Sequence, residues 1–203
     1  ISFLLFFGAS NMTAQAQNTS IGLRGGLNFA TVSGDDVSPD TKSKLGVNFG
    51  ALLTYSINSN FGITGELNFT GKGYKDGSSD VTVGINYLEI PIYGAYYFGA
   101  ADASLRPKIF AGPTVGILMT ATAKDDDTDL DLKEFYEPLE LGAVFGLGVH
   151  KRVGDGNWVC IDLRYNLGLT DIIKDNLGTI NLDPAKNNVI SLNLAYTFPL
   201  GNN

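Results

Sequence analysis

Histidine and cysteine supply many of the nucleophiles, proton-transfer groups and metal ligands of proteins, and each occurs once here, as His150 and Cys160. A catalytic triad places a histidine between a serine and a carboxylate, and zinc centres usually combine several histidines or cysteines. His150 stands beside a predicted short turn, and the chain contains no Gly-x-Ser-x-Gly motif. A single cysteine excludes an intrachain disulfide and a cysteine-based zinc site. We therefore predict no enzyme activity and no catalytic, cofactor-binding or metal-binding residues.

A run of carboxylates is the second feature that could do chemistry. It comprises Asp125, Asp126, Asp127, Asp129, Asp131 and Glu134. Dense carboxylates can bind Ca²⁺, but this segment lacks the glycine and the terminal glutamate of an EF-hand loop. We favour a solvated acidic loop over a Ca²⁺ site.

Seven further charged residues stand within stretches that are otherwise apolar or built of small residues. The cations are Arg24, Lys108 and Arg164, and the anions are Glu66, Glu89, Glu140 and Asp162. Their signs nearly cancel, as a confined interior requires, because unpaired buried charge is costly. They predict a structural network of salt bridges and hydrogen bonds. A path for ions or protons is the alternative, and the structural interpretation is favoured.

The residues around these charges alternate between large apolar and small or polar types. In the last such segment the large residues are Ile190, Leu192, Leu194, Tyr196 and Phe198. Successive side chains of a strand point to opposite faces, so alternation predicts strands with one apolar face. The pattern predicts strands at 21–29, 47–57, 61–69, 86–98, 108–119, 139–149, 159–169 and 190–198.

The predicted connections alternate in length. Short ones lie near residues 58–60, 99–104 and 154–156, and long ones span about 31–44, 71–84, 120–136 and 170–187. Outer-membrane barrels place short turns in the periplasm and long loops outside the cell. The order therefore predicts an all-β fold, an eight-stranded antiparallel up-and-down transmembrane β-barrel.

The two faces distinguish a membrane barrel from a soluble one. Eight strands enclose an interior only wide enough for side chains, so five large apolar residues per strand would overfill it. We therefore expect the apolar face, including the strand from Ile190 to Phe198, to meet lipid, and the small and polar face to fill the lumen. Aromatic residues near strand ends predict interfacial girdles. They are Tyr55, Tyr87, Tyr96, Tyr97, Phe98, Trp158, Tyr165, Tyr196 and Phe198.

The size and charge of the chain limit its partners. Its 203 residues suit one domain, and its net charge of −7 disfavours nucleic acid. The apolar stretch Ile1–Gly8 and the Ala14-Gln15-Ala16 pattern predict that residues 1–16 are the remnant of a cleavable signal peptide. Residues 17–203 then form the barrel domain, exported to the outer membrane of a Gram-negative bacterium.

Six segments resemble the PorT-like outer-membrane β-barrel family of Bacteroidetes-type bacteria, a "porin family". They are GLRGGLNFATVSGD (22–35), ELNFTGKGYK (66–75), NYLEIPIYGAYYF (86–98), FAGPTVGILM (110–119), LRYNLGLTDI (163–172) and NVISLNLAYTF (188–198). The resemblance implies a small integral outer-membrane barrel, and its eponymous members are associated with protein secretion. The strand Ile190–Phe198 also looks like a barrel-assembly signal, although Pro199 to Asn203 follow it.

The expected function is that of a non-enzymatic outer-membrane barrel with a plugged polar interior. Its loops, such as 31–44 and 120–136, would contact envelope proteins in a structural or interaction role, and its wall would contact outer-membrane lipid. Transport of small solutes is the alternative, and a lipid-modifying outer-membrane enzyme is disfavoured further.

Overall fold

Nine strands make up almost all of the computed structural model, which describes residues 18–34, 37–77, 81–125, 128–154, 156–174 and 184–200. The strands are β1 (Thr19–Ser33), β2 (Lys42–Ser56), β3 (Phe61–Lys75), β4 (Thr82–Tyr97), β5 (Leu105–Asp125), β6 (Thr128–Asp131), β7 (Leu139–Val153), β8 (Asn157–Gly168) and β9 (Lys186–Pro199). A 3-10 helix, η2 (Lys133–Phe135), follows β6. No helix in this described part of the chain is long and apolar enough to cross a membrane.

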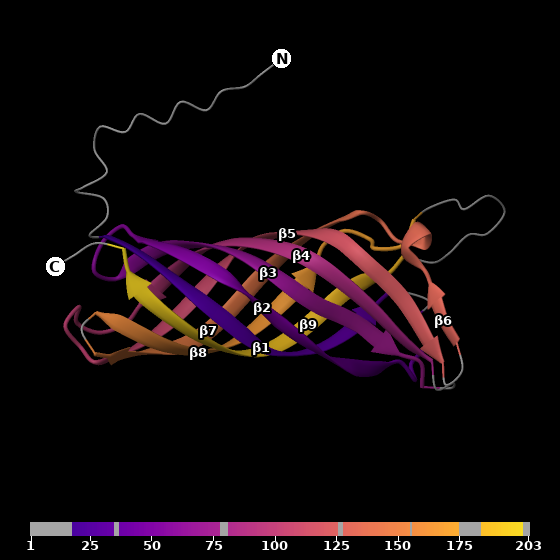
Figure 1. Ribbon diagram of the computed structural model, residues 1–203, viewed down its shortest axis with the longest axis horizontal. Coiled ribbons are helices and arrows are strands. Elements are labelled where there is room, and N and C mark those ends of the chain that lie inside the picture. The colour runs from indigo at the N-terminus through magenta and orange to yellow at the C-terminus, as the bar shows by residue number, and fades with distance from the viewer. Residues whose placement is uncertain are drawn as a thin grey trace, which may run out of the picture.

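Antiparallel pairing closes the sheet into a barrel (Figure 1). The strands run in the order β4-β3-β2-β1-β9-β8-β7-β5-β6, and β4 also pairs with β5. Strand β6 pairs only with the last residues of β5, where Asp125 lies opposite Thr128, so eight strands form the closed wall. The predicted eight-stranded antiparallel barrel is confirmed.

The strands are longer than the alternation predicted. Strand β3 continues beyond Phe69 to Lys75, and β4 begins at Thr82, so the predicted long loop 71–84 is wrong. The predicted loop 120–136 is also wrong in part, because β5 extends to Asp125 and is followed by β6 and η2. Pairing with neighbouring strands sustains these extensions, although they lack a regular apolar face. Gly73 stands opposite Gly84 in the pairing of β3 with β4. Its φ of 123° is a backbone conformation that favours glycine, so the residue type allows the pairing to continue here.

The two ends of the barrel differ. At one end, the turn end, lie the connections after β2, β4 and β7 and both described termini, where the Leu200 amide donates a hydrogen bond to the Thr19 carbonyl. The other end, the loop end, carries β6, η2 and the connections after β1, β3 and β8 (Figure 1). The expected signal-peptide remnant at residues 1–16 lies outside the described residues.

The outer wall presents the large apolar side chains. In β9 the outward residues are 43–57% exposed, and they are Ile190, Leu192, Leu194, Tyr196 and Phe198. The side chains between them, Ser191, Asn193, Ala195 and Thr197, are buried in the lumen. A polypeptide that exposes its large apolar residues and buries its polar ones is inverted relative to a soluble protein.

Three of the aromatic residues expected in the interfacial girdles are placed differently. Tyr87 is fully buried inside the barrel, and Tyr97 packs edge-on against His150. Both stand at inward positions of β4, on the same face as Glu89 and Tyr93. Trp158 stands on the inward face of β8, which it shares with Cys160 and Asp162, and its ring packs against His150. The girdle prediction used distance from the strand end and neglected which face each ring occupies, so it is wrong for these three residues.

Candidate functional site

The centre of the lumen holds a carboxylate between two guanidinium groups. Glu66 on β3 accepts from Arg24 Nη1 on β1 at 2.5 Å, and Arg164 on β8 donates through Nη1 and Nη2 at 2.9 and 3.0 Å. Asn68 Nδ2 and the Tyr93 hydroxyl donate to the same carboxylate at 2.8 and 2.7 Å. A two-pronged guanidinium–carboxylate contact fixes geometry as well as charge. Glu66 is therefore the common acceptor for four side chains.

Asp162 extends this cluster across β8. Arg164 Nε donates to Asp162 Oδ1 at 2.5 Å, and Asn193 Nδ2 donates to the same oxygen at 3.2 Å. Lys108 Nζ lies 3.9 Å from Asp162 Oδ2 and 4.8 Å above the Phe110 ring. We call Arg24, Glu66, Lys108, Asp162 and Arg164 the central network. Its formal charge is +1, from three cations and two anions.

A second group of charges lies toward the loop end. Lys72 Nζ is 3.0 Å from Glu89 Oε1 and 3.0 Å from Glu140 Oε2, and it stands 5.0 Å from the centre of the Tyr87 ring. The Thr70 hydroxyl donates to Glu89 at 3.2 Å, and Asn187 Nδ2 donates to Glu140 at 3.2 Å. We call Lys72, Glu89 and Glu140 the upper network. Its formal charge is −1, from one cation and two anions.

The structure places all seven charged residues named from the sequence inside the barrel, where each is at most 7% exposed. They are Arg24, Glu66, Glu89, Lys108, Glu140, Asp162 and Arg164. Sequence reasoning missed two further buried cations, Lys72 and Arg106. Lys72 follows Glu66, Asn68 and Thr70 at the same two-residue spacing in β3, so alternation could have predicted that it points inward. It was missed because the predicted strand ended at Phe69.

Arg106 closes the turn end. Its Nη2 donates to the Ser59 carbonyl at 2.6 Å and to the Tyr97 carbonyl at 3.3 Å, and its guanidinium lies 5.4 Å from the centre of the Tyr97 ring. His150 is packed between rings, 5.1 Å from Tyr97 and 6.2 Å from Trp158. Its Nε2 is buried and has no hydrogen-bond partner among the described residues. The single histidine of the chain is therefore packed between two aromatic rings at the turn end.

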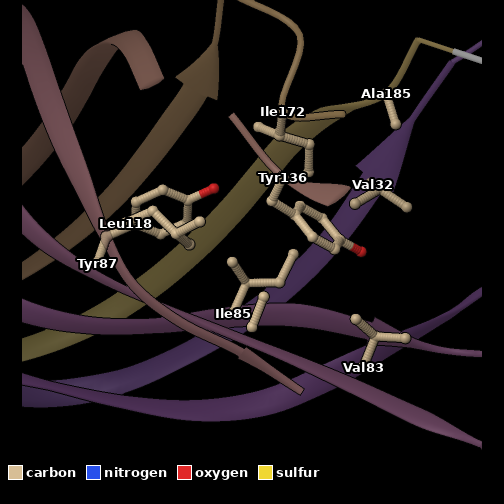
Figure 2. Close-up of a cluster of buried hydrophobic side chains, with 9 residues drawn as sticks. Val32, Val83, Ile85, Tyr87, Leu118, Tyr136, Ile172 and Ala185 are labelled. Carbon is tan, nitrogen blue, oxygen red and sulfur yellow. The ribbon is translucent and has the colours of Figure 1, made fainter. Parts of the chain in front are cut away.

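The loop end is closed by apolar side chains (Figure 2). They come from strands on different sides of the barrel and from the loops, and they are Val32, Val83, Ile85, Tyr87, Leu118, Ala121, Tyr136, Ile172 and Ala185. We call these residues the cap. The prediction that small and polar residues fill the whole lumen is wrong here, because a separate apolar core occupies the mouth.

Backbone pairing holds the loop residues of the cap in place. Tyr136 and Ile173 form an isolated antiparallel bridge. The Glu137 amide donates to the Ile172 carbonyl at 2.8 Å, and the Ile172 amide donates to the Ala185 carbonyl at 2.9 Å. Burial raises the pKa of the Tyr136 hydroxyl above its ordinary value, and the neighbouring Tyr74 raises it further. The raised pKa is the effect expected of an apolar setting, which disfavours the charged phenolate.

Two hollows at the loop end share Tyr136 in their lining. One, of about 530 Å³, is lined by the charged residues Asp131, Lys133 and Lys174 together with Leu118 and Pro138. The other, of about 240 Å³, is lined mainly by apolar groups, among them Val37, Tyr74 and Ile173. Between the central and upper networks the free space is only about 10 Å³, room for about one water molecule.

The described residues offer no group of three or more histidine, cysteine or carboxylate side chains that could hold a metal ion. Asp126 and Asp127 of the acidic segment lie outside the described residues. Asp129 pairs with Lys124 at 3.0 Å, and both side chains are exposed. Cys160 is buried, and its sulfur lies 3.7 Å from Asp162 Oδ2.

Packing against the central network predicts a large difference between two glycines. A β-carbon at Gly146 would overlap the Phe110 ring, which is held by Tyr93 at 4.7 Å and by Arg164 at 4.9 Å. We expect Gly146→Ala to lower the free energy of unfolding by about 1–3 kcal/mol, the usual cost of overpacking. Urea titration in detergent, followed by gel mobility, measures it. A β-carbon at Gly65 would meet nothing within 4 Å, so Gly65→Ala is the matched control. Equal stabilities would contradict the packing argument.

Comparison with known proteins agrees with this architecture. The family model described as "Outer membrane protein beta-barrel domain" matches residues 14–174. Neisserial surface protein A is 15% identical, with 86% of this chain and 95% of that chain covered and a TM-score of 0.52. OprG from Pseudomonas aeruginosa is 13% identical, with 92% and 99% covered and a TM-score of 0.49. Ail, the attachment invasion locus protein of Yersinia pestis, is 15% identical, with 89% and 99% covered and a TM-score of 0.48.

No curated protein matches the chain. The structural likeness at this level of identity concerns the fold, whereas the family match covers most of the sequence. Barrels of this kind belong to the outer membrane of Gram-negative bacteria. The chain is a member of the outer membrane protein β-barrel domain family.

Proposed function

We propose that this protein is a non-enzymatic barrel, closed to solutes, that acts through its extracellular surface as a structural or interaction protein of the cell envelope. One observation carries the proposal: the lumen is filled at every level. The Arg106 cluster closes the turn end, the two ionic networks fill the middle, and the cap closes the loop end. Because an eight-stranded wall leaves room only for its own side chains, the working surface is outside the lumen.

The orientation follows from the lengths of the connections. Short turns of outer-membrane barrels face the periplasm, so the turn end lies there and the loop end faces the exterior. The belt of exposed apolar side chains, including Leu192 and Leu194, contacts outer-membrane lipid. The two hollows beside Tyr136 make the exterior face uneven, and side chains of a partner can fit into them.

The PorT-like resemblance supports a more specific version, in which the partners belong to a machinery that secretes proteins across the envelope. Deleting the gene in its host and measuring the proteins released into the medium tests this version. Reintroducing a chain whose residues 133–137 are replaced by a Gly/Ser linker should fail to restore release, whereas the wild-type chain should restore it. Normal release in the deletion strain would refute the secretion role and leave the closed barrel untouched.

The surroundings of His150 support the absence of enzyme activity. The imidazole contacts the Tyr97 and Trp158 rings, and within the described chain no serine or carboxylate donates to it or accepts from it. A hydrolase that attacks outer-leaflet lipid needs its nucleophile and base at the loop end, whereas His150 lies at the turn end.

Planar-bilayer recording distinguishes the closed barrel from a small-solute porin. Purified wild-type protein is expected to give no stepwise conductance, because the free space between the two networks is about 10 Å³. A porin of known conductance, reconstituted in the same way, serves as the positive control. Reproducible unitary steps from the wild-type protein, absent from mock preparations, would overturn the closed-barrel proposal in favour of transport.

A further inference from the structure

Three lysines share one side of the loop end. Lys186 begins β9, Lys42 begins β2 and Lys75 ends β3, and all three are exposed. These strands are neighbours in the order β3-β2-β1-β9. We call Lys42, Lys75 and Lys186 the basic rim.

The basic rim points outward from the wall. Tyr74 lines the apolar hollow at the mouth, and the exposed Lys75 follows it in β3. Since neighbouring side chains of a strand point to opposite sides, Lys75 faces outward. Lys42 is paired with Lys75 and therefore shares its face, and the register shift between Ser43 and Asn48 lets Lys42 and Leu45, three residues apart, both face outward. On β9, Asn187 is buried in the lumen, so Lys186 next to it also faces outward.

Lys42 and Lys75 stand directly opposite each other in the pairing of β2 with β3. Two like charges in this position destabilise a strand pair. None of the salt bridges among the described residues involves a member of the basic rim. Lys44, whose Nζ donates to the Lys72 carbonyl at 3.2 Å, adds positive charge at the same mouth. By contrast, Lys124 on β5 is neutralised by Asp129 at 3.0 Å.

The height of the basic rim above the apolar belt indicates what can neutralise it. Phe29, Leu45 and Ile190 lie side by side across β2, β1 and β9 and are 50–58% exposed, so they mark the upper border of the belt. Lys42 is three residues beyond Leu45, and Lys186 is four beyond Ile190. In a strand tilted by about 45°, this places them roughly 7–9 Å above the border. The headgroup layer is about 5–7 Å deep on each side of a bilayer, and lysine side chains reach along it.

We propose that the basic rim binds the phosphate groups of an anionic glycolipid in the outer leaflet. Ammonium groups pair with phosphate as point charges, and lysines held near a charged membrane surface contribute additively. Phosphates lying between Lys42 and Lys75 would remove the repulsion that the strand pairing creates. The proposal rests on the orientation inferred above, with the loop end outside.

The test measures lipid binding by the full chain in phosphatidylcholine nanodiscs titrated with lipid A. The variant Lys42→Gln/Lys75→Gln/Lys186→Gln is expected to bind lipid A at least tenfold more weakly than the wild type. The control variant Lys124→Gln/Lys133→Gln/Lys174→Gln removes the same charge elsewhere on the loop end and is expected to lose less than twofold. Rising salt should weaken wild-type binding, because the groups are exposed.

Equal losses in the two triple variants, or no loss in the first, would overturn the proposal. Inorganic phosphate that competes fully at the concentration of lipid phosphate would show an anion site with no preference for lipid, which also overturns it. Heat-modifiable gel migration confirms that each variant is folded. Labelling of Lys75 on intact cells with a membrane-impermeant amine reagent tests the orientation separately, so a wrong orientation and a missing lipid site give different results.

Discussion

Replacing Glu66 with glutamine is expected to lower the free energy of unfolding by about 3–5 kcal/mol, the cost of removing one partner from a buried ion pair. The substitution keeps the size of the side chain and removes only its charge. Arg24 and Arg164, which both bond to this carboxylate, would then face each other. With Lys108 nearby, the central network would hold three cations and only Asp162 to balance them. In a lumen without bulk water, this imbalance has no solvent to screen it.

Urea titration of the protein in detergent micelles, read from the mobility of folded and unfolded bands, gives the free energy for each variant. Glu134→Gln makes the same chemical change at an exposed carboxylate in η2 and should shift stability by less than about 0.5 kcal/mol. If Glu66→Gln unfolds within 1 kcal/mol of the wild type, then the central network does not hold the barrel together.

The fold could be predicted because the membrane imposes one pattern on every strand. A lipid-facing residue must be apolar and its neighbours must fit a narrow lumen, so β9 alternates from Ile190 to Phe198 without exception. The same rule identified the inward charges. Alternation predicts only whether a side chain points to lipid or into the lumen. It does not predict which side chains in the lumen contact one another.

The partners inside the lumen depend on register and on residues with no side chain. Arg24 reaches Glu66 across β2, where Gly50 stands opposite Arg24 and its other neighbour is Asn68. A β-carbon at Gly50 would collide with Asn68 and with the Leu67 carbonyl, so the close packing of β2 against β3 at this level needs a glycine. The hydropathy pattern predicts neither the register of the three strands nor the position at which a glycine is needed.

The cap was unpredictable for a different reason. Tyr136 and Ile172 belong to loop segments that carry no period-two alternation, and an isolated bridge and a few backbone hydrogen bonds bring them together. Their burial is decided by the shape of the mouth, which forms only after the strands have paired. Loop residues that close a lumen therefore resemble ordinary loop residues in the sequence.

The two ionic networks also depend on each other. The central network carries +1 and the upper network −1, and the small cavity between them is lined by Arg24 and Arg164 on one side and by Thr70 and Glu89 on the other. Opposite net charges at short range attract more strongly in a low-dielectric interior than in water. The two networks together hold four cations and four anions, so their charges cancel only when both networks are counted.

Removing the single cation of the upper network is the second large perturbation. Lys72→Met keeps an unbranched side chain of similar length but leaves Glu89 and Glu140 as buried carboxylates with no cation between them. We expect a loss of about 3–5 kcal/mol of unfolding free energy at neutral pH. Lys124→Met is the comparison, because it breaks a pair of the same length whose side chains are 62% and 65% exposed. An exposed pair contributes about 0.2–1 kcal/mol.

A third variant separates charge from packing. In Lys72→Met/Glu89→Gln/Glu140→Gln the upper network has no charge left, and replacing a whole buried ionic group is often neutral or stabilising. The triple variant should therefore recover most of the stability that Lys72→Met loses, when both are measured by the same urea titration. If it is as unstable as the single variant, the lysine stabilises the barrel through its packing against Tyr87 and not through its charge. Recovery would show instead that the charged lumen is tolerated only because each carboxylate there has a cation within reach.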